Sequence, residues 1–386
     1  MLVDFKEHKV LPALLMVIFG FYNCLALGAL EMLAASYALL SALILSSLYA
    51  AFLVLRQRVI QRYDLLFFFL MLLVFAVSLI ENVDWKNWLF TIFDISLMLF
   101  LFEYYSHSIK YLMIGSLIGF SLSIYWGGID IAMHPEIWIN EDSKDVTGFL
   151  LGGNYNQIGC RLLCGLVTNI LCLKICKWFW INLIALIVAS VGILFMVQSM
   201  TSLSSILLFL FVCIIPNIKL QRLAMVCIFL GVILFQVFVC FSGKGLENND
   251  FAVWFIVDVL GKDITFTYRT DMWDSALRII PDSPIWGFGF VDADWYMKNM
   301  SSFAIGPHNT VFGVLIYGGI IGLITYMSII LISVYKIFAI ADKMSTVLLC
   351  SLGVLSIMML MEVYPLTFVL YLCVLMFYYR QFAKIK

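Results

Sequence analysis

Apolar stretches separated by short polar connectors run along almost the whole chain. A helix of about 20 apolar residues crosses a hydrocarbon core of about 30 Å, and the backbone inside that core must be hydrogen-bonded within its own segment. The pattern therefore predicts an all-α, polytopic membrane protein with about 12 transmembrane helices. The predicted spans cover approximately residues 10–30, 32–55, 64–81, 88–102, 109–126, 154–173, 179–197, 199–216, 221–241, 308–333, 344–363 and 364–380. The spans at 88–102 and 199–216 are short and also fit re-entrant segments.

The composition agrees with this pattern and excludes an ordinary soluble domain. Hydrophobic residues make up 64% of the chain and charged residues only 12%, against about 25% charged residues in soluble domains. We therefore interpret residues 1–386 as one integral membrane domain, and we expect no nucleic-acid partner. The first apolar run follows Lys6 and Lys9 without a convincing small-residue cleavage site, so we expect a retained helix rather than a removed signal peptide.

The distribution of charge predicts the orientation in the membrane. With both termini inside, the inner connectors hold 15 of the 23 Lys and Arg residues, as the positive-inside rule requires. The acidic residues concentrate in the outer connectors, two of which are long. These two are residues 127–153 and the main loop, residues 242–307. Because the polar residues gather on one face, we expect the protein to act at that face.

Small residues inside the spans indicate helix packing. The ten cysteines lie in or at the ends of apolar runs, so we expect no fixed disulfides. Cys160, Cys164, Cys172 and Cys176 share a helix face without neighbouring histidines or carboxylates, and helix packing explains them better than a metal site. Gly115 with Gly119, and the group Gly318, Gly319 and Gly322, predict close approach of helices. The sequence shows no internal repeat of the kind found in many transporters.

The main loop contains a segment with helical period. Across residues 264–280 one stripe carries Phe266, Arg269, Trp273, Leu277 and Ile280. Pro281 ends the helix and Pro284 prevents an early restart. Such an amphipathic element lies on the membrane surface or roofs a cavity between the spans.

Arg269 and His308 are the candidate chemical groups. An arginine in an apolar stripe either snorkels to lipid headgroups or directs its planar guanidinium at a phosphate in bidentate fashion. A histidine at the edge of a span is either structural or a general base, for which its unperturbed pKa near 6.5 is suited. The two together in one outer loop favour chemistry over packing.

Two other patterns in the loop are less specific. The turn from Pro284 to Gly289 contains Gly287 and Gly289 and suits close backbone approach. Asp292 and Asp294 form a DxD pattern like that of metal-dependent nucleotide-sugar transferases. Nucleotide sugars are not expected on the outer side, so we interpret both carboxylates as solvated charges and expect no metal and no cofactor.

The order of these motifs resembles the O-antigen ligase and polymerase family, bacterial integral membrane proteins of surface-polysaccharide assembly. The resemblance is carried by Arg269-x-x-x-Trp273-x-x-Ala276, by Pro284-x-x-Gly287-x-Gly289, and by His308-Asn309. The segment GGNYNQIG before Arg161, the Ser- and Thr-rich turn at 199–205, and Glu362 extend it. Family members often have a Ser-Arg pair where this chain has Ser202 and Leu203, which suggests that Arg161 takes over the task of that arginine.

The resemblance implies a GT-C-like fold and metal-independent glycosyl transfer on the outer face of the bacterial inner membrane. The donor would be a glycan linked to undecaprenyl pyrophosphate, and the acceptor a second glycan. His308 would remove the acceptor proton, and Arg269 would stabilise the departing diphosphate. Arg161 and Arg278 are further cation candidates, and Glu362 would orient an arginine or the acceptor. The remaining predicted substrate-binding residues are Trp273, Asn309, Gly287 and Gly289.

Three functions fit the sequence. A polymerase joining repeat units is favoured by the modest length and the compact outer loop. A ligase moving finished glycan onto lipid A core uses the same chemistry. A flippase or transporter of the lipid-linked glycan is disfavoured because few charges lie in the middle of the spans, Asp94 being the clearest. A non-catalytic assembly partner is also possible, and it would need neither Arg269 nor His308. Membrane lipid, and a flippase and chain-length regulator of the same pathway, are the expected partners.

Overall fold

The computed structural model describes residues 10–26, 33–57, 60–134, 150–151, 155–248, 250–259, 268–302 and 304–384, and these contain helices but no strand. Twelve helices coincide with the twelve predicted apolar stretches. They are α1 (Val10–Cys24), α2 (Leu33–Gln57), α3 (Arg62–Ile80), α4 (Trp85–Tyr104), α5 (Ile109–Met133), α7 (Ile158–Cys172), α8 (Phe179–Met196), α9 (Met200–Ile214), α10 (Ile218–Phe238), α14 (Thr310–Phe338), α15 (Lys343–Met359) and α16 (Leu366–Phe377).

The prediction of an all-α polytopic membrane protein is confirmed. Seven helical segments are long and apolar enough to cross a membrane, namely those beginning at Leu33, Arg62, Trp85, Ser106, Phe179, Ile218 and Thr310. The other five helices that coincide with predicted spans have 12 to 17 residues. The number of twelve spans therefore stays a prediction.

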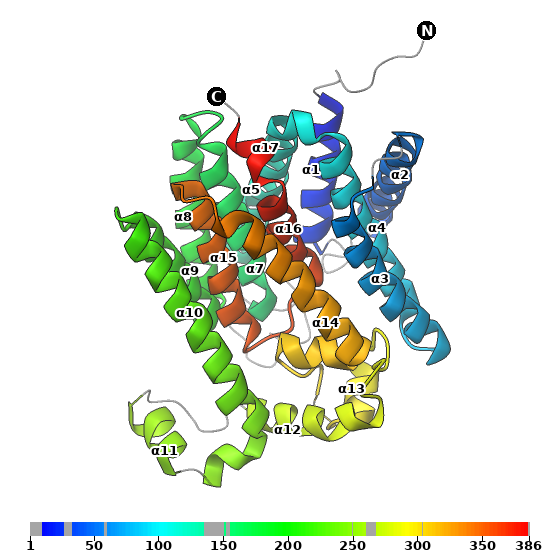
Figure 1. The fold of residues 1–386 in the computed structure, drawn as a ribbon, viewed down its shortest axis with the longest axis vertical. Coiled ribbons are helices and arrows are strands. Elements are labelled where there is room, and N and C mark those ends of the chain that lie inside the picture. The colour runs from blue at the N-terminus through cyan, green and yellow to red at the C-terminus, as the bar shows by residue number, and fades with distance from the viewer. Residues whose placement is uncertain are drawn as a thin grey trace.

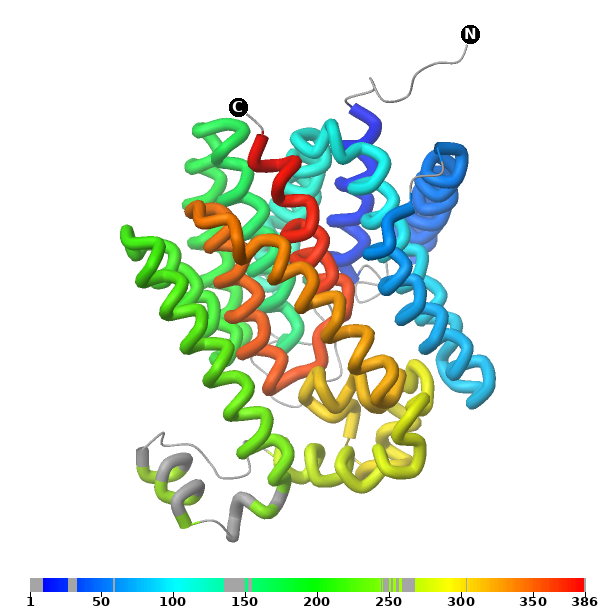
Figure 2. Tube along the Cα trace, in the orientation of Figure 1, coloured from blue at the N-terminus to red at the C-terminus, as the bar shows by residue number. Residues whose placement is uncertain are grey.

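The helices run up and down between two ends of the molecule (Figure 1). One end carries both chain termini, and we call it the termini end. The opposite end carries the elements of the main loop, and we call it the loop end; the tube in Figure 2 shows the same separation. Basic residues cluster at helix ends and connectors of the termini end, namely Arg56, Lys110, Lys174, Lys177, Lys219, Arg222, Lys336, Lys343, Arg380 and Lys384. This clustering is the pattern expected of a cytoplasmic face.

The predicted glycine contact in the fifth span is confirmed. Gly115 and Gly119 of α5 face α1, where a Cβ on Gly115 would lie 2.2 Å from the carbonyl oxygen of Ala13. A Cβ on Gly119 would lie 3.1 Å from the Cα of Gly20. The two helices therefore approach closely because side chains are missing on both sides of the contact.

A break in α14 receives the turn Pro284–Gly289. Gly319 has φ 58° and ψ −158°, which interrupts the helix. The turn fills the gap with backbone hydrogen bonds: the N–H of Phe288 donates to the carbonyl of Ile316 at 2.7 Å, and the N–H of Ile320 donates to the carbonyl of Pro284 at 2.9 Å. Main-chain groups freed by the kink are thus satisfied by the loop, as buried polar groups require.

The prediction that Gly318, Gly319 and Gly322 pack against a helix is therefore partly wrong. A Cβ on Gly319 would lie 2.3 Å from the carbonyl carbon of Ile285, which belongs to the turn. Gly318 and Gly322 do face α3, but only at ordinary contact distances of 3.5 Å or more. Gly319 is needed for its positive φ and for the approach of the turn, which a helix-packing motif does not explain.

The main loop is built from short helices. They are η6 (Cys240–Asn248), α11 (Asp250–Val253), the π-helix η7 (Trp254–Val259), α12 (Arg269–Ile279), η8 (Ile280–Asp282) and α13 (Ala293–Asn299). The predicted helix at 264–280 corresponds to α12, which starts after Tyr268 in the left-handed conformation and gives way at Ile280 to η8, which contains Pro281. Trp273 is fully buried on the inner face of α12, as its stripe predicts, whereas Phe266 lies outside the described residues.

The second predicted outer loop, residues 127–153, is described only at its edges. Its first residues continue α5 to Met133, and most of the others fall outside the described ranges. The short helix η5 (Tyr155–Gln157) follows and leads into α7. Gln157 at its end contributes to the site below.

Candidate functional site

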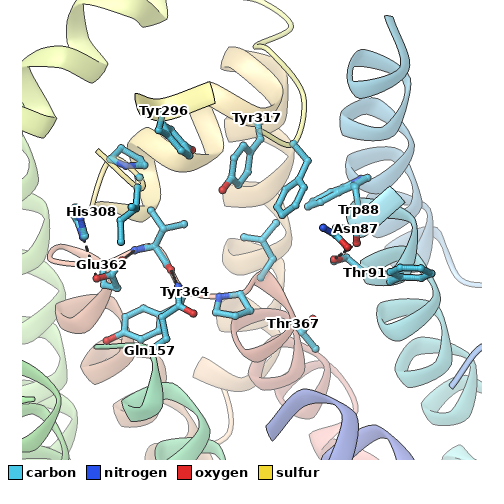
Figure 3. Close-up of a pocket in the computed structure, with 18 of the residues that line it drawn as sticks. Asn87, Trp88, Thr91, Gln157, Tyr296, His308, Tyr317, Glu362, Tyr364 and Thr367 are labelled. Atoms are coloured by element: carbon cyan, nitrogen blue, oxygen red, sulfur yellow. Dashed lines mark hydrogen bonds and ion pairs between the residues drawn. The ribbon is translucent and has the colours of Figure 1, made fainter. Parts of the chain in front are cut away.

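A cavity of about 420 Å³ opens at the loop end, between α1, α4, α14 and the connection from α15 to α16. Its walls combine aromatic side chains with a few polar groups, as in typical ligand pockets. Figure 3 shows His308 and Glu362 on one side of this space and Trp88 with Thr91 on the opposite side. Tyr296 and Tyr317 lie along the edge formed by α13 and α14.

His308 and Glu362 form a hydrogen-bonded pair on one wall of the cavity. The Nδ1 atom of His308 lies 3.1 Å from Oε2 of Glu362 (Figure 3). Their side chains are 20% and 8% exposed, respectively, so the pair is largely shielded from solvent. Oε1 of Glu362 accepts a hydrogen bond from the N–H of Val363 at 3.0 Å, which fixes the carboxylate. A carboxylate at Nδ1 favours the tautomer with a proton there and leaves Nε2 as an acceptor.

The backbone of His308 is held in an unusual conformation. Its φ is 45°, a left-handed value that is rare for a residue with a side chain. The next residue, Asn309, is buried and caps α14 by accepting hydrogen bonds from its first N–H groups. Asn309 Nδ2 also donates to Gln236 Oε1 at 2.8 Å and to the carbonyl of Leu360 at 3.2 Å. The left-handed backbone of His308 is strained, and such strain persists only where the surrounding structure imposes it. Strained residues of this kind are often found at functional sites.

Side chains of helix α12 contact the backbone of this pair from the loop side. The Nε of Arg269 donates to the carbonyl of Met361 at 2.9 Å, immediately before Glu362 in the chain. The indole N–H of Trp273 contacts the carbonyl of His308 at 3.5 Å. Arg269 is partly buried and Trp273 is completely buried. Both predicted residues therefore bond to the backbone at or next to the His308–Glu362 pair, while neither belongs to the wall of the cavity.

Arg161 is buried and bonds to backbone carbonyls. Its Nε donates to the carbonyl of Asn23 at 3.1 Å, and its Nη1 donates to the carbonyl of Gln157 at 2.7 Å. The guanidinium carbon lies 5.2 Å from the ring centroid of Phe368. The Gln157 side chain in turn donates to the carbonyl of Val363 at 3.1 Å. Arg161 thus joins α1 to the segment beside Glu362, and it is not part of the cavity wall.

Three other predicted site residues lie away from the cavity wall. Arg278 is 66% exposed and pairs with Asp274 at 3.1 Å. Gly287 and Gly289 are in the left-handed region with φ of 72° and 80°. A Cβ on Gly287 would meet α14 at 2.5 Å, and one on Gly289 would meet Ser78 of α3 at 2.6 Å. The close backbone approach predicted for the glycines is therefore made to neighbouring helices.

The sequence did not single out the wall opposite His308. Trp88, Thr91 and Tyr317 lie in apolar stretches, where nothing in their spacing distinguishes them from lipid-facing residues, and Phe290 follows the turn Pro284–Gly289 in the main loop. They meet because α3 and α4 fold as a hairpin beside α14 (Figure 1). The fixed aromatic rings of Trp88 and Phe290 lie 5.2 Å apart between centroids.

Asp94, behind the same wall, is a residue that did stand out in the sequence, as the clearest charge in mid-span. It is buried in α4 and accepts hydrogen bonds from Asn23 at 2.6 Å and from Thr367 at 2.7 Å. Thr367 lines the cavity, so Asp94 lies immediately behind the cavity wall. A carboxylate buried among membrane helices is costly, and its hydrogen bonds offset part of that cost.

Asp292 of the DxD pattern caps a helix, and three of the four clustered cysteines are buried in the core. Oδ1 of Asp292 accepts a hydrogen bond from the N–H of Trp295 at 2.9 Å and caps α13. Cys160, Cys164 and Cys172 are buried in the helix core. Among the residues that the structure describes, no three His, Cys, Asp or Glu side chains come together as a metal site would require.

The cavity can therefore support proton transfer from a bound hydroxyl. His308 offers an accepting nitrogen, and Glu362 stabilises the imidazolium that forms when a proton arrives. Burial raises the pKa of the Tyr296 phenol well above its usual value, so this neighbour stays neutral and does not compete as a base. Arg269 places a permanent positive charge on the loop side of the pair.

Comparison with known proteins finds a similarity to one family over part of the chain. Residues 178–327 match the family model described as O-antigen ligase. The match runs from the start of α8 into α14 and includes Arg269, Trp273 and His308, but it ends before Glu362 and begins after Arg161. It confirms the resemblance found in the sequence. No curated protein matches the chain.

Proposed function

We propose a reaction for this chain from the match of residues 178–327 to the O-antigen ligase family model, which supports a function in surface-polysaccharide assembly. The protein transfers a glycan from undecaprenyl pyrophosphate to a hydroxyl of a second glycan, at the outer face of the bacterial inner membrane. The observation that carries the proposal is the His308–Glu362 pair inside the cavity at the loop end.

His308 acts as the general base. The acceptor hydroxyl attacks the anomeric carbon of the donor while its proton passes to Nε2 of His308. The bond between the anomeric carbon and the phosphate oxygen breaks, and the diphosphate leaves with the electron pair. Glu362 holds the imidazole by Nδ1 and stabilises its charged form, a positioning role that follows from the distance of 3.1 Å. The left-handed φ of His308 fixes where Nε2 points.

Arg269 stabilises the departing diphosphate. Negative charge grows on the leaving oxygen, and a fixed guanidinium offsets it without reorganisation during the reaction. The hydrogen bond to Met361 fixes the Nε side of Arg269 one residue away from Glu362. We place the diphosphate at the loop-side edge of the cavity, between Arg269 and His308. Arg161 supports this geometry through Gln157 and Val363, and Arg278 adds charge further out.

The opposite wall of the cavity binds sugar rings. Trp88, Phe290 and Tyr317 present apolar faces, while Thr91 supplies a polar atom beside them (Figure 3). In a pocket of this kind, the aromatic rings provide contact area for the ligand, and the few hydrogen-bonding groups fix its orientation and make binding selective. The cavity of about 420 Å³ holds the reacting ends of donor and acceptor, and longer glycans extend past the loop.

We favour polymerisation of lipid-linked repeat units as the reaction, because the outer loop of residues 242–307 is compact. Ligation of finished glycan to lipid A core is the second candidate, and the description of the matching family favours it. Both use the same groups and differ in the acceptor that reaches the cavity.

A strain lacking the gene separates the two reactions. Surface glycan that stops at one repeat on the core indicates a missing polymerase, and bare core indicates a missing ligase. Purified protein should lengthen lipid-linked repeat units in the presence of a metal chelator. If the protein only moves the lipid across vesicle membranes and forms no glycosidic bond, the proposed transfer is wrong and transport replaces it.

A further inference from the structure

A second open cleft lies at the termini end, far from the site described above. It has a volume of about 710 Å³ and is bounded by the residues before α3, by η3 (Ser106–Ser108) with the start of α5, by the end of α14, and by α17 (Tyr379–Ala383). Five basic side chains from three distant parts of the sequence line it, namely His107, Lys110, Lys336, Arg380 and Lys384. Basic side chains that converge on one cleft from separate segments indicate a ligand site more specifically than a run of basic residues in a single connector does.

The positive charge of this cleft is not neutralised by nearby side chains. No carboxylate is among the residues that line it. Within the described ranges, the structure shows no ion pair for Lys110, Lys336, Arg380 or Lys384. Two buried carboxylates contact Gln61 at the edge of the cleft without lining it. Glu103 accepts hydrogen bonds from the Gln61 side chain and from the hydroxyl of Tyr378, and Asp64 accepts one from the N–H of Gln61.

The cleft also offers apolar contacts beside its charges. Lys336 lies over the ring of Phe377, with Nζ 5.1 Å from the ring centroid. The neighbouring surface of α14 exposes Leu331 and Tyr335, which are 61% and 80% accessible. A ligand that fits this arrangement has an anionic head for the cations and an apolar part that lies along α14.

We propose that this cleft binds the headgroup of an anionic phospholipid. Basic pockets between transmembrane helices on the cytoplasmic side are suited to phosphate-bearing lipid heads, and the distribution of charge predicts that the termini end is cytoplasmic. Arg380 binds the phosphate through its planar guanidinium, and Lys110 and Lys336 add point charges. The acyl chains lie against the exposed apolar face of α14. This site is separate from glycosyl transfer and does not depend on it.

The test compares two variants with equal changes in charge. One is the triple variant Lys110→Gln/Lys336→Gln/Arg380→Gln, which removes three cations from the cleft. The matched control is Lys177→Gln/Lys219→Gln/Lys343→Gln, which removes three exposed cations from the same end outside the cleft. Full-length protein is reconstituted in nanodiscs of phosphatidylcholine containing phosphatidylglycerol, and retained phosphatidylglycerol is counted by native mass spectrometry after release.

The cleft variant should bind phosphatidylglycerol about 100-fold more weakly, because each cation near the lipid contributes about fivefold. The control should retain binding within about fivefold of the unmodified protein, and high salt should weaken binding only where the cleft is intact. Unchanged binding in the cleft variant, or equal loss in both variants, would overturn the proposal. A melting curve for each variant verifies folding.

A competition experiment distinguishes a phospholipid headgroup from a soluble phosphate as the ligand of the cleft. Inorganic phosphate is added at millimolar concentration to unmodified protein in the same nanodiscs. The lipid should stay bound, since its apolar chains contribute to affinity. If inorganic phosphate displaces the phosphatidylglycerol completely, the cleft is a site for a soluble phosphate and the lipid assignment is wrong.

Discussion

The two ends of the molecule use charge in opposite ways. At the loop end, His308 is paired with Glu362, Arg161 is bonded to two carbonyls, and Arg278 is paired with Asp274. At the termini end, the cations of the basic cleft are exposed and have no carboxylate beside them. The loop end therefore contains charged side chains that hydrogen bonds hold in place before substrate binds. The termini end exposes a group of cations that have no carboxylate beside them.

This difference separates catalysis from binding. Preorganised groups act over hydrogen-bond distances and depend on exact placement, and they are little affected by salt when partly buried. Exposed cations act over longer distances and are screened by salt. We therefore expect single substitutions of His308 or Arg269 at the loop end to remove most of the activity, and single substitutions at the termini end to have small, salt-dependent effects.

The largest effect is expected for His308→Ala. Loss of the general base should reduce glycan transfer by about 1000-fold, within the range measured for such groups. The readout is polymer length in cells and turnover of purified protein on lipid-linked repeat units. His134→Ala is the matched control, because His134 is exposed at the end of α5 and does not line the cavity. Normal polymer in the His308 variant would falsify the assignment of the base.

Arg269→Lys comes next. Lysine keeps the charge but loses the planar fork and the Nε that donates to Met361. We expect turnover to fall by about 100-fold, as for removal of one transition-state donor, while the protein stays inserted in the membrane. Full activity of this variant would show that Arg269 only reaches for lipid headgroups.

Arg278→Lys sharpens the contrast on the same helix. Arg278 is exposed and its ion pair with Asp274 is a surface pair, so the change should cost less than about fivefold. The two variants are compared in one membrane preparation at equal protein level. An effect as large as that of Arg269→Lys would move the phosphate contact to the outer face of α12.

Gly319→Ala tests the link between the turn and α14. The added Cβ would lie 2.3 Å from the backbone of Ile285 at a residue with φ of 58°, so we expect a loss of about 2 kcal/mol in stability. The measurement is the melting temperature in detergent. Gly322→Ala in the same helix is the control, since its Cβ would have no neighbour closer than 3.7 Å. Equal melting temperatures would mean that the kink is not needed.

The sequence predicted the helices well because hydrophobic length is a strong signal. It also predicted Arg269, Trp273 and His308, which the fold brings together with Glu362. That grouping depended on polar residues standing out from an apolar background. Residues of the opposite wall, such as Trp88, carried no such signal.

The orientation of individual side chains was beyond the sequence. Arg161 is an intramembrane cation and therefore a strong functional candidate, yet its guanidinium bonds to the carbonyls of Asn23 and Gln157. Gly287 and Gly289 were predicted to let a backbone approach something closely, and the partners are α14 and α3. A pattern predicts that a close contact exists, but only the packing of distant segments decides what makes it.

Asp292 offers the smallest effect and the clearest test of the DxD pattern. Its carboxylate caps α13 through the N–H of Trp295, and asparagine is an equally good cap. Asp292→Asn should therefore leave both stability and transfer unchanged. Asp292→Ala should lower stability by about 1 kcal/mol through loss of the cap, which a melting curve detects, with turnover retained. A metal-binding role would instead make both variants lose activity, because neither asparagine nor alanine keeps the charge that a cation needs. If Asp292→Asn loses activity and added divalent metal restores it, the loop end binds a metal and the contrast between the two ends changes.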